Sequence, residues 1–167
     1  SFHAYTVHFN PALNIMLLPF SIGTGKTTIA RVIVNVLFGL GLLPSNKIVE
    51  TSALDLTADY VGQTTTKVKA ALKEANGGVL FVDEAYNLGF GQFGKEACDT
   101  IVAAMTDDQF KDLVIVIAGY PREIDQMLDS NSGLKSRFTH FFEFPDWLPH
   151  DCKAFFHTLA AKRNFIL

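Results

Sequence analysis

Two uninterrupted apolar runs constrain the fold of this chain more than any other feature of its sequence. Residues 79–82 read Val-Leu-Phe-Val and residues 113–117 read Leu-Val-Ile-Val-Ile, with no polar side chain at alternate positions. Strands without such alternation are buried on both faces, which is typical of a parallel sheet covered by helices on both sides. The two runs therefore predict an α/β domain.

Further apolar runs alternate with amphipathic stretches along the rest of the chain. The expected strands are residues 13–18, 47–51, 79–83, 113–118 and 141–144. The expected helices, marked by apolar residues three and four positions apart, are residues 27–40, 65–75, 94–105, 121–128 and 149–163. Residues 146–149 form a plausible hinge before the last helix. This alternation predicts a parallel sheet between layers of helices.

Composition and charge exclude several classes of protein. Apolar residues make up 49% of the 167 positions and charged residues 19%, which excludes a disordered chain. The net charge of −3, with both signs well mixed, argues against a large nucleic-acid surface. Cys98 and Cys152 lack metal-ligand spacing, and we expect both to be reduced, half-buried thiols of an intracellular protein.

We expect the start of the chain to be neither a secretory signal nor a membrane span. A secretory signal needs a basic leader, and no Lys or Arg precedes Lys26. The apolar stretch 12–20 is too short to cross a bilayer. We expect a buried strand there, in a piece of a longer protein without a membrane partner. The compartment stays open because a targeting segment would precede Ser1, with the cytoplasm favoured.

The motif Gly23-Thr24-Gly25-Lys26-Thr27-Thr28 is the strongest chemical signal, because it follows an expected strand and opens an expected helix. Phosphate binding needs backbone N–H groups at a helix start, a flexible cation, and a hydroxyl for Mg²⁺. The glycines allow close backbone approach, Lys26 reaches the β- and γ-phosphates, and Thr27 holds the metal. The alternative, a glycine-rich turn with a chance Gly-Lys-Thr, is disfavoured by this context. Phe20 stands where the phosphate-loop pattern has glycine, a departure that costs about 1–3 kcal/mol if the backbone there needs a positive φ.

A pair of carboxylates, Asp83-Glu84, follows the buried strand 79–83. Ligands of open α/β sheets bind at the carboxyl ends of the strands. Asp83 is expected to orient Mg²⁺ through its water shell, and Glu84 to polarise the water that attacks the γ-phosphate of ATP. An acidic pair after a strand is commonly a solvated turn, but its combination with the Gly-Lys-Thr loop is more specific.

These motifs, in this order, resemble the ATPase domain of the AAA+ superfamily, in particular the group of the red-type rubisco activase CbbX and the sporulation protein SpoVK. The resemblance extends from Gly23 to Pro145. Besides the two motifs above, the matching stretches are Tyr60-Val61-Gly62-Gln63-Thr64, Gly77-Gly78-Val79, Ala85-Tyr86, Phe93-Gly94-Lys95-Glu96-Ala97, Ala118-Gly119-Tyr120-Pro121, Leu128-Asp129-Ser130-Asn131 and Ser136-Arg137-Phe138.

The resemblance implies roles for further residues. Tyr60-Val61-Gly62 matches the central-pore loop that grips a threaded polypeptide; the alternative is a tyrosine packed at a strand–helix junction. Arg137 matches the arginine finger that reaches a neighbouring subunit's γ-phosphate, and Lys135 stands near the place of a second arginine. Tyr120 occupies the sensor position, although a packed core tyrosine is an equal alternative. Residues 87–93 are a weaker candidate for a second pore loop.

The resemblance also implies the architecture and the partners. We expect a three-layer α/β P-loop domain with a five-stranded parallel sheet in the order 5-1-4-3-2 over residues 1–148, and the start of a helical lid over residues 149–167. The parent protein is expected to be a Mg·ATP-driven remodelling ATPase that forms a hexameric ring, or a hetero-oligomer with related subunits. Its client protein is open: rubisco, a secretion component or another protein.

Two other functions compete with this interpretation. The first is a degenerate module that assembles with active homologues but hydrolyses little ATP, which Phe20 favours and the intact Lys26, Asp83, Glu84 and Arg137 disfavour. The second is a P-loop kinase of small molecules. That reading is disfavoured, since it needs an acceptor-binding lid and leaves the pore-loop motif without a purpose.

Overall fold

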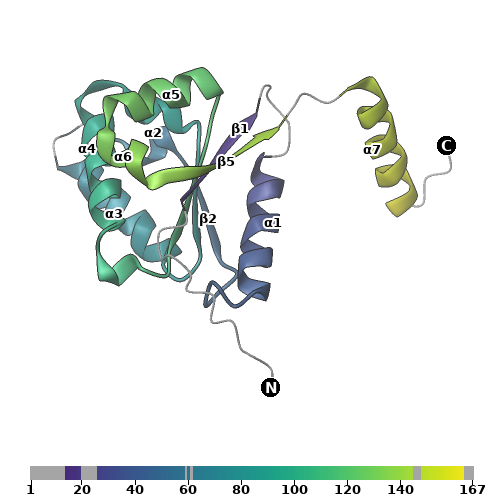
Figure 1. Cartoon of the computed structure of the whole chain (residues 1–167), viewed down its shortest axis with the longest axis horizontal. Coiled ribbons are helices and arrows are strands. Elements are labelled where there is room, and N and C mark those ends of the chain that lie inside the picture. The colour runs from purple at the N-terminus through teal and green to yellow at the C-terminus, as the bar shows by residue number, and fades with distance from the viewer. Residues whose placement is uncertain (1–13, 20–25, 59, 61, 145–147, 164–167) are drawn as a thin grey trace.

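The fold was analysed in a computed structural model of the chain, which describes residues 14–19, 26–58, 60, 62–144 and 148–163. Helices and strands alternate through this part of the chain (Figure 1). In order they are β1 (Asn14–Pro19), α1 (Lys26–Gly39), β2 (Ile48–Ser52), α2 (Ala53–Leu56), α3 (Gln63–Ala75), β3 (Val79–Asp83), the 3-10 helix η1 (Ala85–Gly89), α4 (Gly91–Ala104), the 3-10 helix η2 (Asp108–Phe110), β4 (Val114–Ala118), α5 (Pro121–Ser130), α6 (Ser132–Arg137), β5 (Phe138–Phe144) and α7 (Pro149–Lys162).

The strands form one five-stranded sheet in the order β2-β3-β4-β1-β5. Every neighbouring pair is parallel. Counted from the other edge, this is the 5-1-4-3-2 order that the resemblance implied. Because all strands run the same way, the carboxyl ends of β1, β3 and β4 lie next to one another at one end of the sheet.

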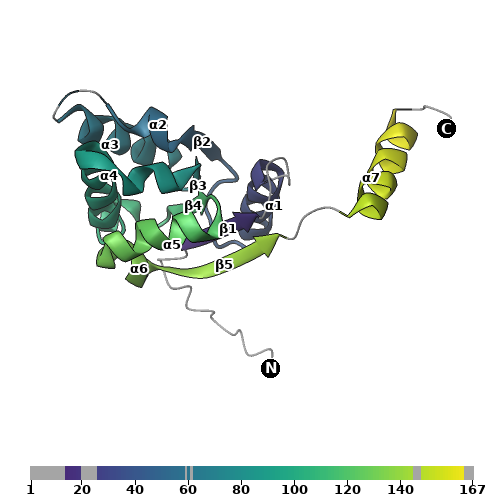
Figure 2. The same ribbon diagram turned by 90° about the horizontal axis from the view of Figure 1, so that it is seen from above.

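The hydrophobic core has two parts, one on each face of the sheet, and the buried strands contribute side chains to both. Along β3, Leu80 and Val82 pack with the helices α2 to α6, whereas Val79 and Phe81 pack with α1. All four side chains are at most 1% exposed. Helices therefore cover both faces of the sheet, with α1 on one face and α3, α4 and α5 on the other (Figure 2). This is why no polar alternation is present in the sequence of β3.

The turn between α3 and β3 requires a glycine at position 78. A β-carbon added to Gly78 would lie 2.3 Å from the carbonyl oxygen of Lys47, which also accepts the N–H of Val79 at 2.9 Å. The absence of a side chain lets β3 enter the sheet directly beside β2.

Two expected boundaries were wrong by three residues. β5 begins at Phe138, three residues before the expected start, and α4 begins at Gly91 instead of residue 94. The stretch 87–93, a candidate second pore loop, is mostly helical because η1 ends at Gly89 and α4 begins two residues later. Only Phe90 lies between the two helices, and its side chain is 64% exposed.

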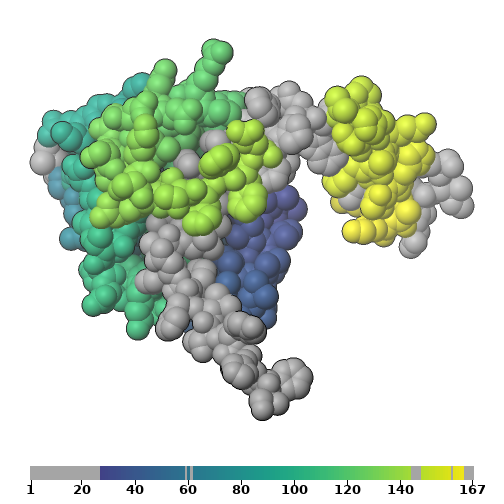
Figure 3. Space-filling model, in the orientation of Figure 1, coloured from purple at the N-terminus to yellow at the C-terminus, as the bar shows by residue number. Residues whose placement is uncertain are grey.

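The last helix, α7, stands apart from the sheet in Figures 1 and 3. Its Phe155 and Phe156 side chains are 50% and 59% exposed. The expected hinge before it lies partly outside the described residues. None of the helices in the described part of the chain has the length and apolar character needed to cross a lipid bilayer.

Candidate functional site

The carboxyl ends of β1, β3 and β4 bring most of the predicted nucleotide-binding residues to one end of the sheet. Lys26, Thr27 and Thr28 form the first turn of α1, the helix that follows β1. Val82 of β3 pairs with Ile117 of β4, which pairs in turn with Met16 of β1. Asp83 ends β3, and only β4 separates β3 from β1, the strand that precedes α1. Phe20, Gly23, Thr24 and Gly25 lie outside the described residues.

The two acidic residues after β3 differ in exposure and backbone conformation. Asp83 is half-buried, and its Oδ1 accepts the N–H of Glu84 at 2.9 Å. Glu84 is exposed and adopts a left-handed conformation with φ 50° and ψ 37°. It is the one non-glycine residue with positive φ in the described part of the chain. Such a conformation costs about 1–3 kcal/mol and is found mostly at functional sites.

Tyr120, the predicted sensor residue, packs against a residue to which the sequence assigned no role. The rings of Tyr120 and Tyr86 lie 6.1 Å apart at an angle of 34°. A β-carbon on Gly119 would lie 2.9 Å from Cδ1 of Tyr86, so this approach depends on the glycine. Burial raises the pKa of Tyr86, and the negative charge of Glu84 raises it further. The protonated phenol of Tyr86 thus lies beside the acidic pair.

Tyr60 and Gly62 of the predicted pore loop lie directly before α3. Tyr60 is 70% exposed, which excludes the alternative of a packed junction tyrosine. Gly62 forms the N-cap of α3 with φ 83°, a conformation that favours glycine. The buried Thr64 accepts the N–H of Ala58 at its Oγ1, at 3.1 Å. Val61 lies outside the described residues.

Arg137 lies at the opposite end of the sheet from Asp83. It is the last residue of α6, directly before β5, and Phe138 pairs with Asn14 at the start of β1. β1 runs from Asn14 to Pro19, so at about 3.3 Å per residue its carboxyl end lies roughly 17 Å further along the strand. Arg137 Nη1 donates to the carbonyl oxygen of Gly133 at 3.1 Å. The fold therefore separates Arg137 from the nucleotide-binding end of its own sheet.

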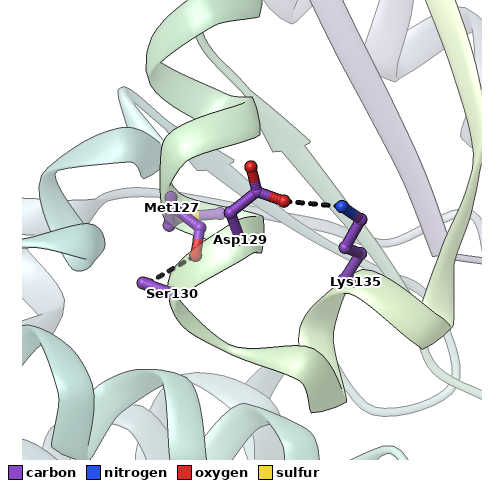
Figure 4. A network of polar contacts seen from close by, with 4 residues as sticks. All are labelled: Met127, Asp129, Ser130 and Lys135. Carbon is purple, nitrogen blue, oxygen red and sulfur yellow. Dashed lines mark hydrogen bonds and ion pairs between the residues drawn. The ribbon is translucent and has the colours of Figure 1, made fainter.

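The second basic residue of this region, Lys135, is paired within the chain. Its Nζ donates to Oδ1 of Asp129 at 2.5 Å, and the Ser130 hydroxyl donates to the Met127 carbonyl at 2.7 Å (Figure 4). The hydrogen bond and charge of Asp129 raise the pKa of Lys135. The Lys135–Asp129 pair joins α6 to the end of α5, and the Ser130 hydrogen bond lies within the last turn of α5.

The donor groups at the nucleotide-binding end fit Mg²⁺ and phosphate. The Thr27 hydroxyl and the Asp83 carboxylate are oxygen ligands, which Mg²⁺ prefers. The N–H groups of the first turn of α1 have no partner within the helix, and such groups suit a phosphate group. Within the described ranges, no three His, Cys, Asp or Glu residues cluster as a metal site of their own.

Relatives of the chain are bacterial secretion-system proteins. The chain is 46% identical over 145 residues to ESX-1 secretion system protein EccA1 of Mycobacterium tuberculosis, covering 83% of this chain and 25% of the relative. It is 48% identical over 135 residues to EccA1 of Mycolicibacterium smegmatis (77% and 23% covered) and 43% identical over 148 residues to ESX-3 secretion system protein EccA3 of Mycobacterium leprae (86% and 23% covered). The chain thus spans about a quarter of the length of these relatives.

Solved structures with low sequence identity share the fold. The FIGL-1 AAA domain in complex with ADP superposes with a TM-score of 0.62 and 20% identity, covering 91% of this chain and 49% of that one. A RuvB mutant of Thermotoga maritima superposes with a TM-score of 0.66 and 22% identity, covering 92% and 45%. The family described as "ATPase family associated with various cellular activities (AAA)" matches residues 16–146. The chain belongs to this AAA family.

Proposed function

We propose that this chain is the Mg·ATP-hydrolysing domain of a ring-forming ATPase that remodels protein clients. The observation that carries the proposal is the meeting of the α1 start, the Asp83–Glu84 pair and Tyr120 at one end of the sheet. Membership of the AAA family supports nucleotide binding in general. The individual roles below rest on the motifs and on the places of the described residues in the fold.

Each residue of the nucleotide end has a separate task in this proposal. Residues 23–28 bind the phosphates, with Lys26 on the β- and γ-phosphates and Thr27 on the metal. Asp83 orients the metal through its water shell, and Glu84 accepts a proton from the attacking water. The metal supplies charge neutralisation on the phosphate oxygens when bound. Tyr120 contributes a phenol hydroxyl that can hydrogen-bond a water or a phosphate oxygen.

Arg137 is proposed to act on the neighbouring subunit. Its place at the amino-terminal end of β5 supports this role, because the guanidinium cannot serve the opposite end of its own sheet. A finger supplied in trans requires assembly, so we propose a hexameric ring or a hetero-oligomer with related subunits. We further propose that residues 149–167 begin a helical lid, separate from the domain of residues 1–148.

The client is proposed to be a protein gripped by Tyr60-Val61-Gly62. The exposed ring of Tyr60 offers sequence-tolerant apolar contact. The EccA relatives are secretion-system proteins by name, which favours a secretion component as client over rubisco or a sporulation factor. This interpretation replaces the narrower CbbX and SpoVK resemblance. It fits a cytoplasmic ATPase that needs no nucleic-acid partner.

The experiment is a measurement of nucleotide binding and hydrolysis by the full-length protein over a range of protein concentrations. We expect Mg²⁺-dependent hydrolysis whose rate per subunit rises as the protein assembles, and loss of hydrolysis in EDTA. Binding without hydrolysis in assembled protein would support the degenerate module that Phe20 favours. Absence of nucleotide binding would reject both.

A further inference from the structure

One carboxylate of α4 caps the start of α3. Oε1 of Glu96 accepts the backbone N–H of Thr65 at 3.0 Å and the Thr65 hydroxyl at 2.7 Å. The first N–H groups of a helix have no partner within it, and the N-cap of α3 is Gly62, which has no side chain to supply one. The Thr65 hydroxyl and N–H, together with the Gly62 backbone, lower the pKa of Glu96. The cap of α3 thus comes from 31 residues further along the chain.

A second carboxylate of α4 orients the cap of α6. Oδ1 of Asp99 accepts from Nδ2 of Asn131 at 3.0 Å. This leaves the amide oxygen of Asn131 to accept the N–H groups of Gly133 and Leu134, at 3.0 Å and 3.1 Å. Asp99 therefore fixes which way the amide of the α6 N-cap points.

Glu96 and Asp99 lie on the same face of α4, because residues three apart on a helix are neighbours. Glu96, Asp99, Thr65 and two lysines line an open groove of about 480 Å³ along α3 and α4. The lining carries both signs of charge, which favours contacts within the chain over a site for a charged ligand.

The two capped helices adjoin the two residues with proposed contact roles. Tyr60, the proposed client contact, lies just before α3, and Arg137, the proposed subunit contact, is the last residue of α6. The Tyr60 loop is tied to α3 by Lys67 Nζ on the Thr57 carbonyl, at 2.8 Å, and by the Thr66 hydroxyl on the Gly62 carbonyl, at 3.2 Å. The Asn131 cap and Arg137 share one partner: Gly133 donates its N–H to Asn131 Oδ1 and accepts Arg137 Nη1 at its carbonyl oxygen.

We propose that Glu96 and Asp99 are positioning residues through which α4 holds the Tyr60 loop and the Arg137 helix in a fixed relation. The proposal rests on the roles given above to Tyr60 and Arg137. In this proposal, α4 couples client contact at Tyr60 to the ATP hydrolysis that Arg137 promotes. Residues in contact chains of this kind modulate such coupling by about 2- to 30-fold.

The first test is hydrogen exchange of the full-length protein without nucleotide. Glu96→Ala should speed exchange in residues 57–66, and Asp99→Ala in residues 131–137, with the β-strands unchanged. Glu96→Gln and Asp99→Asn keep an acceptor oxygen and should stay close to the wild type. Glu74→Ala, which removes an exposed carboxylate at the other end of α3, is the matched control.

Unchanged exchange in the named segments, or faster exchange throughout the domain, would overturn the proposal. If Glu96→Ala does not fold, Thr65→Val serves in its place.

The second test compares basal ATP hydrolysis with hydrolysis in the presence of carboxymethylated α-lactalbumin, a permanently unfolded probe. Glu96→Ala should keep the basal kcat within about 2-fold and lose about 2- to 30-fold of the stimulation by the probe, with rescue by Glu96→Gln. Asp99→Ala should lower the basal kcat without changing KM. Equal losses of the basal and the stimulated rate in Glu96→Ala would contradict the proposal, because they would show that Glu96 only stabilises the fold.

Tyr60→Ala separates this inference from the proposed function. If Tyr60→Ala leaves the stimulation by the probe unchanged, the proposed client contact fails, and the exchange measurement still decides whether Glu96 positions the loop.

Discussion

At the scale of single residues, Asp83 and Glu84 are neighbours in sequence but differ in what surrounds them. Asp83 is half-buried at the end of a core strand, and Glu84 is exposed in a left-handed conformation. The half-buried carboxylate of Asp83 is suited to a fixed position near a metal, and the exposed one of Glu84 to contact with water. This difference supports a division of labour that mutants can resolve.

Lys26→Ala is expected to abolish nucleotide binding, because the loop loses its cation for the β- and γ-phosphates. Glu84→Gln is expected to preserve binding but to lower kcat by about 10²-fold or more, since the amide cannot accept a proton. A fluorescent nucleotide measures binding, and phosphate release measures turnover. Equal loss of binding in both mutants would contradict the separate roles, and Glu74→Gln controls for the loss of an exposed carboxylate.

Phe20→Gly tests the one departure from the phosphate-loop pattern. If the aromatic ring strains the loop or shields it, glycine should raise nucleotide affinity, by about 10-fold for each 1.4 kcal/mol of strain removed. Titration with Mg·ATP is the measurement. Unchanged affinity would mean that Gly23, Gly25 and the start of α1 suffice.

The two cysteines are predicted to differ in reactivity, although the sequence suggested two half-buried thiols. Cys98 is 2% exposed, and burial raises its pKa to about 12, so the reactive thiolate is scarce at pH 8. Cys152 is exposed on α7. Ellman's reagent at pH 8 should modify Cys152 in the native protein and Cys98 only after denaturation, with Cys152→Ser as control. Rapid reaction of native Cys98 would show that α4 is not packed as described.

At the scale of elements, the entry of β3 into the sheet depends on Gly78. Gly78→Ala places a β-carbon against the Lys47 carbonyl oxygen, a backbone atom that cannot move without disturbing β2. We expect the free energy of unfolding to fall by about 1–3 kcal/mol, measured by urea denaturation. Gly39→Ala is the control, because nothing lies within 4 Å of its added β-carbon. Equal stability of the two variants would contradict the packing described for this turn.

The sequence predicted elements with an uninterrupted pattern better than elements whose pattern is broken or very short. β3 has the expected bounds because its apolar run ends at a charged residue. β5 was predicted too short because Thr139 and His140 interrupt its apolar run. α2 was not predicted, although Ser52 and Asp55 form a capping box that could have indicated it.

Only those residues of the candidate site that belong to a local sequence motif could be predicted. Asp83, Glu84 and Tyr60 stand at element ends that the sequence marks. The contacts Glu96–Thr65 and Asp99–Asn131 join residues more than 30 positions apart. Such pairs depend on how α3, α4 and α6 pack, and no local pattern encodes that.

At the scale of the whole molecule, the parallel sheet places the two halves of the proposed chemistry at opposite ends. Asp83 and Glu84 follow the carboxyl end of β3, and Arg137 precedes the amino-terminal end of β5. In the proposed function, a complete site needs two copies of the chain, each contributing one end. The proposal of a ring assembly rests on this separation.

The most direct test of this account is a mixing experiment with two inactive variants of the full-length protein. Arg137→Ala should bind ATP nearly normally but hydrolyse it about 10³- to 10⁵-fold more slowly, because the neighbouring site loses its finger. Glu84→Gln should be inactive for a different reason. In mixed rings, the intact Glu84 of one variant meets the intact Arg137 of the other, so ATP hydrolysis should return as the two are combined. Full activity of dilute, monomeric wild-type protein, or no activity in mixtures shown to contain mixed rings, would contradict the account.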